Sequence, residues 1–334
     1  MRLMFRLVLA AGVAAGCFLV TLRLMTPAGP AQVAPGGHAS TAATARVPAA
    51  DRDGRGGSGG GGGRDDGDDH GGAGQPVDPA LFSPGACVAF APTAGDRHET
   101  VFLDAGHGGI DPGAVGATQN GTPVSESAVN LPIELDTMAL LRAEGYRVVV
   151  SRTANTSVTK LTSADVSGGI LTTTGAFADV AARDVCANLA RADVLVGIYM
   201  DGGYAGDAGC LTGYDADRPF SAQNVRLATL VQNDVLAAMN ARGWQIPNDG
   251  VLPDSGLGSA TSAAAQAYDH LLLLGPAQAG YFSTPSMMPG ALIEPLYVTD
   301  PFEASIAVSA QGQHVIAGGI AKAISQYFAS ARRG

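Results

Sequence analysis

Short apolar runs alternate with helical patterns over most of the chain after residue 77. Residues 101–103, 146–150 and 194–199 are rich in β-branched side chains, and polar or glycine-rich residues lie at their ends. This pattern is typical of buried strands. Residues 270–274 and 291–293 are two further apolar runs, which we also expect to be strands.

Helical periodicity fills the intervals between these strands. Apolar side chains recur at a spacing of three or four residues, which predicts an amphipathic helix over Leu131, Leu135, Met138 and Leu141. Pro132 fits best in a first helical turn, so this helix is expected to begin near Asn130 or to be kinked there. Residues 177–191 and 218–242 carry the same helical pattern.

The final helix has a clear start. Asp300 can cap it, Pro301 suits the first helical position, and Glu303 would complete a capping box. The apolar stripe then continues to Phe328. Strands alternating with helices predict an α/β protein, with a central, mostly parallel or mixed sheet flanked by helices. We expect a single catalytic domain over residues 77–334.

The N-terminal part has a different composition. Arg2 and Arg6 precede an apolar run over residues 7–22, so residues 1–25 are predicted to be an export signal or an uncleaved membrane anchor. Residues 26–76 are rich in Gly, Asp, Ala and Pro, which predicts a disordered linker. The domain would then be extracytoplasmic, and attached to the cytoplasmic membrane if the anchor remains uncleaved.

Charge and cysteine content narrow the function. A formal net charge of −10 argues against a nucleic-acid partner. The exported part contains Cys87, Cys186 and Cys210, so it can form at most one internal disulfide. We favour Cys87 with Cys210, because both are predicted to lie in loops that can approach each other freely.

The chemistry is concentrated in residues 101–116, which read VFLDAGHGGIDPGAVG. The apolar run ends in a glycine-rich turn, and His107 is the side chain that the strand delivers there. Glycines on both sides let the backbone approach whatever His107 contacts, and neutral imidazole is a common metal ligand. A turn histidine without a ligand is the alternative for such a motif alone.

These sixteen residues resemble the opening motif of the zinc-dependent N-acetylmuramoyl-L-alanine amidases, which cleave peptidoglycan. The resemblance continues in order along the chain. It implies that His107 in GHGG and Glu126 in ESAVNL hold a Zn²⁺ ion, and that Glu294 in ALIEPLYVTDP transfers protons. Bacterial peptidoglycan is the partner that this resemblance implies.

The chain departs from the family at one ligand. The family has a second zinc histidine in a pattern like SIHxN, where this chain reads Gly-Ile-Tyr199-Met-Asp201. Tyr199 could bind as a phenolate, although the reference pKa of tyrosine is about 10. Asp201 lies two residues along, on the same face of the strand, and could supply an oxygen instead. For His270 a packing role is favoured over ligation.

Three functions therefore remain open. The leading hypothesis is an amidase that cuts between the lactyl group of muramic acid and the first alanine of the stem peptide. The second is a pseudo-enzyme that binds peptidoglycan or a partner without cleaving it, because Tyr199 replaces the histidine. A zinc peptidase acting on stem peptides is the third.

Overall fold

The computed structural model describes residues 74–204, 206–258 and 262–331. Its centre is an eight-stranded mixed sheet. Across the sheet the strands are β1 (Gln75–Pro76), β2 (Ala86–Phe90), β6 (Arg147–Arg152), β3 (Thr100–Ala105), β9 (Val194–Ile198), β12 (Gly290–Glu294), β10 (Cys210–Tyr214) and β11 (Asn248–Pro253). The four central strands β6, β3, β9 and β12 are parallel to one another, whereas β2 and β10 run antiparallel to their inner neighbours.

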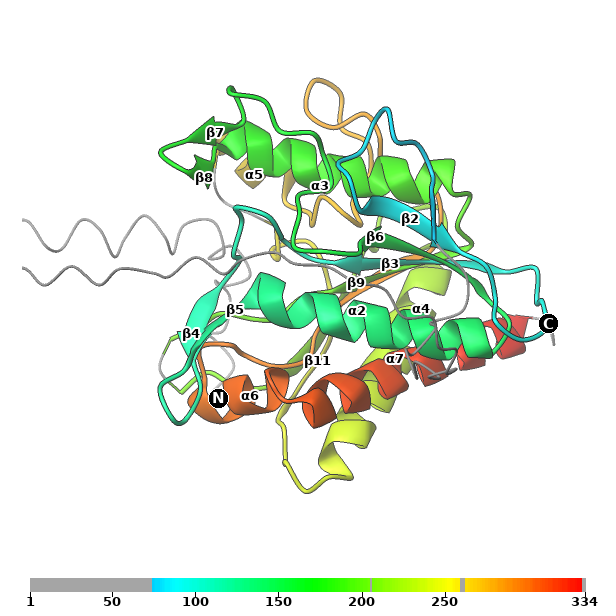
Figure 1. Cartoon of the computed structure of the whole chain (residues 1–334), viewed down its shortest axis with the longest axis vertical. Helices are drawn as coiled ribbons and strands as arrows, with labels where there is room; N and C mark the ends of the chain where they lie inside the picture. Colours follow the sequence, from blue (N-terminus) through cyan, green and yellow to red (C-terminus); the bar gives the residue numbers. More distant parts are fainter. Residues whose placement is uncertain (1–73, 205, 259–261, 332–334) are drawn as a thin grey trace, which may run out of the picture.

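Helices cover both faces of this sheet (Figure 1). On one face lie α2 (Glu126–Ala143), α4 (Ser221–Asn240) and α7 (Ala310–Ala331), with α6 (Pro301–Ala307) leading into α7. On the other face lie α3 (Thr173–Leu189) and the short α5 (Ala263–Tyr268). Two small hairpins, β4 (Val115–Ala117) with β5 (Pro123–Ser125) and β7 (Val166–Ser167) with β8 (Ile170–Leu171), project from these layers.

The central strands are apolar on both faces because both faces are covered. In β3, Val101 and Leu103 belong to the core beneath α2, α4 and α7, whereas Phe102 belongs to the core beneath α3. In β9, Val194 and Val196 alternate in the same way with Leu195. The predicted α/β fold with a mixed central sheet is confirmed.

The N-terminal predictions fall largely outside the described residues. This applies to residues 1–25 and to the linker up to residue 73. The described chain begins at Gly74, and Gln75 and Pro76 already pair with β2, slightly ahead of the predicted domain start at residue 77. Among the described residues, no helix is both long and apolar enough to span a bilayer.

The prediction of a strand over residues 270–274 was wrong. These residues form a turn, in which Gly275 N–H donates to the Leu271 carbonyl. The Arg218 guanidinium donates to the carbonyls of Leu274 and Gly275, so backbone groups that a strand would pair are satisfied by a side chain. Leu273 and Leu274 are still buried. The apolar run therefore predicted that these residues are buried, which is correct, but it did not predict their secondary structure.

Two strands of the sheet lie where the apolar pattern of the sequence indicated no strand. β10 and β11 extend the sheet beyond β12, and Thr212 in β10 is fully buried. Gly213 and the polar residues of β11 weaken the strand pattern in the sequence. Pairing with a neighbouring strand thus determines these elements more than local propensity does.

Helix α2 begins at Glu126, four residues before the predicted start near Asn130, and Pro132 lies inside it. The first turn is stabilised from outside the helix. The N–H of Glu126 donates to the Ala114 carbonyl, and the N–H of Ser127 donates to the Pro112 carbonyl. These loop contacts satisfy donors that are unpaired in an isolated helix, so the helix extends ahead of the proline.

The C-terminal helix is divided in two. Asp300 caps α6 by accepting a hydrogen bond from the N–H of Glu303, as predicted. The Glu303 carboxylate accepts from the N–H of Tyr297 instead of closing a capping box with Asp300. Ser309 then caps α7 by accepting from the N–H of Gly312. Because this second cap starts a new helix, the prediction of one continuous helix was wrong.

The disulfide joins Cys87 in β2 to Cys186 in α3. The predicted pairing of Cys87 with Cys210 was wrong, because Cys210 lies in buried strand β10 and not in a loop. Its thiol faces the Gln232 side-chain oxygen at 3.6 Å. A single disulfide among the three cysteines that the structure describes agrees with the predicted maximum.

Reduction should destabilise the domain strongly. The bridge closes a loop with a sequence separation of 99, for which restriction of the unfolded chain predicts about 5 kcal/mol of stabilisation. Cys186→Ala should therefore unfold at markedly lower urea, and dithiothreitol should not lower its midpoint further. Cys210→Ala is the control and should keep the full response to dithiothreitol. An unchanged urea midpoint of the wild type after reduction would contradict this disulfide.

Candidate active site

The candidate residues meet at one edge of the sheet because three adjacent strands end there. Ala105 at the end of β3 is level with Ile198 of β9, and Ile198 is level with Ile293 of β12. The residues that follow these strands therefore lie side by side. Carboxyl ends of parallel strands are the usual place for a ligand site in an open α/β sheet.

His107 is held between two carboxylates. Its Nδ1 lies 2.8 Å from Asp111 Oδ2, and its Nε2 lies 3.2 Å from Glu126 Oε2. The backbone of His107 has a φ of 62°, which is uncommon outside glycine and is characteristic of functional turns. Asp111 thus fixes the orientation of the imidazole and directs Nε2 at Glu126.

Close contacts with neighbouring residues require glycine at several positions around His107. A Cβ on Gly108 would lie 2.5 Å from the Thr156 carbonyl oxygen, and one on Gly109 would lie 2.8 Å from the Ser157 nitrogen. A Cβ on Gly113 would lie 2.5 Å from Glu126 Oε2. The GHGG turn is therefore pressed against a neighbouring loop, and Gly113 leaves room for the carboxylate opposite His107.

Glu126 is fully buried at the first position of α2. Its Oε2 accepts from the N–H of Ala114 at 2.9 Å, and its Oε1 accepts from the N–H of Met200 at 3.1 Å. Burial alone would lower the pKa of His107, but the charge of Glu126 and the hydrogen bonds of both carboxylates outweigh it and raise the pKa to about 10. The pair therefore favours a positive charge at this position.

Glu294 and Asp201 contribute two more carboxyl groups at this edge. Glu294 is only 8% exposed, and its Oε2 has no hydrogen-bond partner within the described part of the chain. Burial and the charges of Asp201 and Glu126 raise the pKa of Glu294 well above its ordinary range. Burial also raises the pKa of Asp201 to about 6, although hydrogen bonds from Tyr297 and Gly202 lower it.

Tyr199 packs against the site but directs its hydroxyl away from Glu126. Its ring meets the His107 ring edge-on, with centroids 5.5 Å apart. Its hydroxyl donates to Asp104 Oδ2 at 3.0 Å. Burial and the charge of Asp104 raise the pKa of Tyr199 well above its usual value. In this arrangement the side chain is a neutral hydrogen-bond donor.

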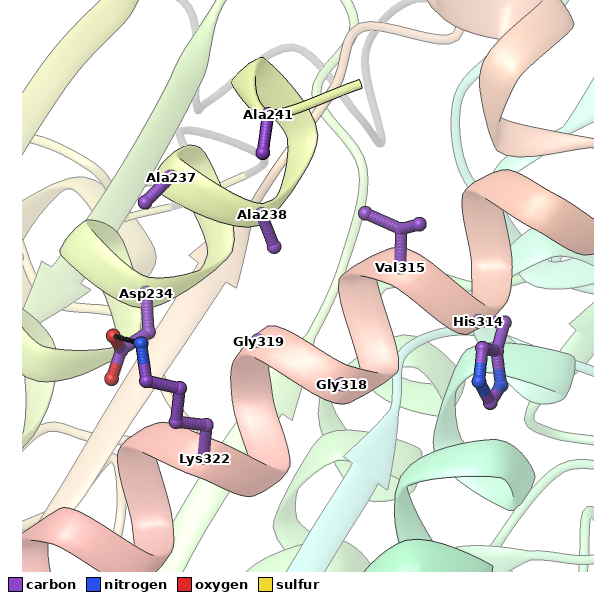
Figure 2. A pocket seen from close by; sticks show the side chains of 9 residues that line it. All are labelled: Asp234, Ala237, Ala238, Ala241, His314, Val315, Gly318, Gly319 and Lys322. Carbon is purple, nitrogen blue, oxygen red and sulfur yellow. Dashed lines mark ion pairs between the residues drawn. The ribbon is translucent and has the colours of Figure 1, made fainter.

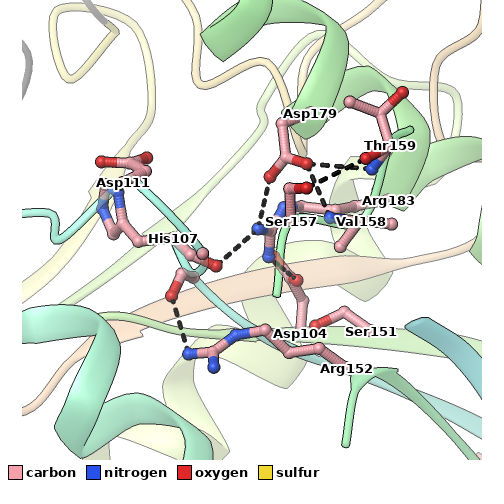
Figure 3. A network of polar contacts seen from close by, with 12 residues as sticks. Asp104, His107, Asp111, Ser151, Arg152, Ser157, Val158, Thr159, Asp179 and Arg183 are labelled. Atoms are coloured by element: carbon pink, nitrogen blue, oxygen red, sulfur yellow. Dashed lines mark hydrogen bonds and ion pairs between the residues drawn. The ribbon is translucent and has the colours of Figure 1, made fainter. Parts of the chain in front are cut away.

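Arg183 connects this site to α3 (Figure 3). The buried guanidinium pairs with Asp104 and Asp179, and it donates to the carbonyls of Ala105 and His107, each at 2.8 Å. Burial opposes the charge of Arg183, but the two carboxylates hold its pKa above the usual value. This contact fixes the backbone that carries His107.

The residues present fit a metal ion in part. In a tetrahedral zinc site, bond lengths of about 2.0–2.2 Å place ligand atoms roughly 3.3–3.6 Å apart, and His107 Nε2 and Glu126 Oε2 are 3.2 Å apart. No third His, Cys, Asp or Glu side chain has a ligand atom within 4.8 Å of both, among the residues that the structure describes. Asp201 lies at the same sheet edge but outside this distance. The Tyr199 hydroxyl is hydrogen-bonded to Asp104 and not to either candidate ligand.

His270 is not at this edge. It faces Asp215 and Asp254 near the ends of β10 and β11. A separate hollow of about 460 Å³ opens between α4 and α7 (Figure 2). None of the candidate site residues lines this hollow; its walls are Asp234, Ala237, Ala238, Ala241, His314, Val315, Gly318, Gly319 and Lys322.

The fold and this edge define an α/β protein with a partly buried histidine beside a buried glutamate at the carboxyl ends of central parallel strands. The model of the amidase 3 family, described as N-acetylmuramoyl-L-alanine amidase, matches residues 101–326 of this chain. Because this match covers more than half of the chain, the chain belongs to the amidase 3 family of N-acetylmuramoyl-L-alanine amidases, as the sequence motifs predicted. The family supports classification of the chain as an amidase.

Individual relatives are distant. The CwlD amidase from Clostridioides difficile, solved in complex with the GerS lipoprotein, is similar in fold, with a TM-score of 0.51 and 22% identity over 70% of this chain and 99% of that chain. An N-acetylmuramoyl-L-alanine amidase from Clostridium difficile 630 gives a TM-score of 0.48 with 23% identity, covering 70% of this chain and 97% of that one.

A curated relative, the uncharacterized protein YqiI of Bacillus subtilis (strain 168), is 29% identical over 145 residues. The aligned segment covers 43% of this chain and 57% of that protein. The chain therefore spans little more than half of this relative's length.

Sequence reasoning missed Glu134, which supports the site from α2. It is fully buried, and its Oε1 accepts from the N–H groups of Ala105 and Ser151, both at 3.0 Å. Burial and, to a smaller extent, the charge of Asp104 raise the pKa of Glu134 to about 8, although the charge of Arg152 opposes this shift. The one sign in the sequence was the position of this glutamate directly after Ile133, an apolar residue that is buried in the structure.

Glu134→Gln should change the pH dependence of stability. The pKa of Glu134 is raised from 4.5 to about 8 by folding, so its stabilising contribution is complete below pH 4.5 and is lost as the pH rises through about 8. Glutamine keeps the acceptor oxygen and does not titrate. The urea midpoint of the variant relative to wild type should therefore rise from pH 5 to pH 8.

Glu134→Ala is the matched comparison, because it leaves the two backbone N–H groups without their acceptor. Each buried unsatisfied donor costs about 1–3 kcal/mol, so this variant should be less stable at every pH. A constant difference between Glu134→Gln and wild type across this range would show that Glu134 does not titrate there.

Proposed function

We propose that the chain hydrolyses the amide bond between N-acetylmuramic acid and L-alanine in peptidoglycan, outside the cytoplasmic membrane. The observation that carries the proposal is the meeting of His107, Glu126 and Glu294 at one sheet edge in a member of this family. The disulfide between Cys87 and Cys186 supports an oxidising compartment. The N-terminal residues 1–25 would supply export or anchoring.

His107 and Glu126 would hold the zinc ion, and Asp201 is our candidate for the third protein ligand, provided that its carboxylate moves closer to them than in this structure. When bound, zinc polarises the amide carbonyl and lowers the pKa of its water to about 7. Asp111 would keep the imidazole oriented through Nδ1. The hydrogen bonds from Ala114 and Met200 keep Glu126 in place.

Glu294 would transfer the proton from water to the leaving amine. Its buried Oε2 has no hydrogen-bond partner in the part of the chain that the structure describes, so no competing hydrogen bond has to break there. Its raised pKa means that it can accept a proton and retain it until the amine departs. Glu126 and Glu294 would thus have different tasks because one is bonded at both oxygens and the other is not.

One observation favours a second candidate function. The Tyr199 hydroxyl is bonded to Asp104, so the family's third ligand has no direct substitute at that position. A protein with only two firm ligands would hold zinc weakly and could bind peptidoglycan without cleaving it. Measurements of metal content and of stem-peptide release separate this binding protein from the amidase, and fragment masses separate both from a peptidase.

Glu294→Gln should abolish hydrolysis and preserve the fold. The substitution keeps the shape of the side chain and removes the proton acceptor, which typically lowers the rate by about 10²–10⁴. Release of stem peptide from purified walls measures the rate, and zinc content should equal that of wild type. Glu144→Gln, at an exposed glutamate that follows α2, is the control and should remain active. Normal turnover by Glu294→Gln would assign proton transfer to another group.

Two substitutions at Tyr199 should separate its possible roles. Tyr199→Phe removes only the hydroxyl, so zinc affinity should be unchanged while the loss of the bond to Asp104 costs about 1–3 kcal/mol of stability. Tyr199→His should bind zinc more tightly and release stem peptide faster, because a neutral imidazole needs no deprotonation at pH 7. Loss of zinc from Tyr199→Phe would identify the tyrosine as a ligand.

A further inference from the structure

We propose that Asp215, Asp254 and His270 form a second divalent-metal site, best suited to zinc, at the sheet edge opposite the candidate active site. The proposed site would have a structural role and is independent of the amidase chemistry. Its three residues come from three separate segments of the chain.

The sheet topology brings two of the ligands together. β10 runs antiparallel to β12, with Leu211 level with Glu294, so β10 begins at the active-site edge and ends at the opposite one. β11 is parallel to β10, with Tyr214 level with Pro253. Asp215 and Asp254 directly follow these two strands. The rule that ligands bind at carboxyl ends of parallel strands therefore applies to this edge as well.

The third ligand follows α5. Asp269 ends this helix in a left-handed conformation with φ of 53° and turns the chain back towards the sheet. His270 Nδ1 then lies 3.1 Å from Asp215 Oδ2 and 3.2 Å from Asp254 Oδ1. Tetrahedral zinc with bonds of about 2.0–2.2 Å separates its ligand atoms by roughly 3.3–3.6 Å. The imidazole nitrogen thus lies at nearly this spacing from each of the two oxygens, and the three ligand atoms all lie within 4.8 Å of one another.

One ligand atom lacks a partner. Asp215 is fully buried, and its Oδ2 makes no hydrogen bond among the described residues although it points at the imidazole. The other oxygen of Asp215 accepts from the N–H of Asp217. A neutral imidazole can place one hydrogen on Nδ1, and that hydrogen bond goes to Asp254. Asp215 Oδ2 is therefore left free for a cation.

The local charge also favours a cation. Asp215 and Asp254 are both buried, and their carboxylates face the same imidazole nitrogen at 3.1 and 3.2 Å. The nearby Arg218 side chain donates its hydrogen bonds to the backbone carbonyls of Leu274, Gly275 and Ser286. A divalent ion would compensate both carboxylates and replace the Nδ1 hydrogen.

The site would clamp the chain that follows β11. Asp254 already accepts from the N–H of Leu271 through Oδ2, and its own N–H donates to the Tyr214 carbonyl. A metal ion bound by Asp254, Asp215 and His270 would join the end of β10, the end of β11 and the turn after α5. Metal binding would thereby stabilise the folded state.

Zinc content of the full-length protein tests this proposal separately from the proposed function. His107→Ala removes the first candidate site and should retain one equivalent of zinc after dialysis against the metal. His107→Ala with Asp254→Asn should lose that equivalent, with affinity at least tenfold weaker. Asp217→Asn is the control: it lies beside His270, with its carboxylate 3.7 Å from Nε2, but outside the three ligands. It should leave zinc content unchanged.

Two further measurements remain decisive if a variant fails to fold. Zinc should raise the Tm of His107→Ala by several degrees, and a chelator should reverse the shift. Anomalous diffraction from zinc-soaked wild-type crystals should show a peak bounded by Asp215, Asp254 and His270. Absence of that peak, or equal zinc content with and without Asp254→Asn, would overturn the proposal. Amidase activity of His107→Ala reports on the first site alone.

Discussion

The ion pairs of the buried Arg183 are the interaction on which the site depends. A fully buried guanidinium is costly unless it is paired and hydrogen-bonded, and here Asp104 and Asp179 supply the charge while Ala105 and His107 supply carbonyls. Asp179 in turn accepts hydrogen bonds from the N–H groups of Val158 and Thr159, in the loop that follows β6. The strand end, the histidine turn, the loop and α3 are thereby fixed relative to one another.

The sequence predicted those elements whose local pattern and burial agree. Apolar runs located β3, β6, β9 and β12, and glycines located the turn that carries His107. It failed where tertiary contacts override local preference: loop carbonyls extend α2 ahead of Pro132, and Arg218 replaces a strand partner at residues 270–274. The cysteine pairing failed for a related reason, because the burial of Cys210 depends on β10 joining the sheet.

The motifs predicted which residues lie together at one sheet edge, but not how their side chains are directed. Motif order placed His107, Glu126 and Glu294 together, and the register of three parallel strands explains why residues so distant in sequence meet. Motif order carried no information on the direction of the Tyr199 hydroxyl, because that direction is set by buried Asp104 across the sheet. Glu134 was missed because a helix pattern does not reveal a carboxyl group turned inward.

The covalent bond between β2 and α3 has a consequence for when the site can form. Cys186 and Arg183 are three residues apart on the same helix, so they lie about one turn from each other. The disulfide therefore anchors the helical segment that holds the histidine turn in place. If the chain is exported as proposed, a chain still reduced inside the cell would lack this anchor, and oxidation outside it would couple assembly of the site to arrival in that compartment.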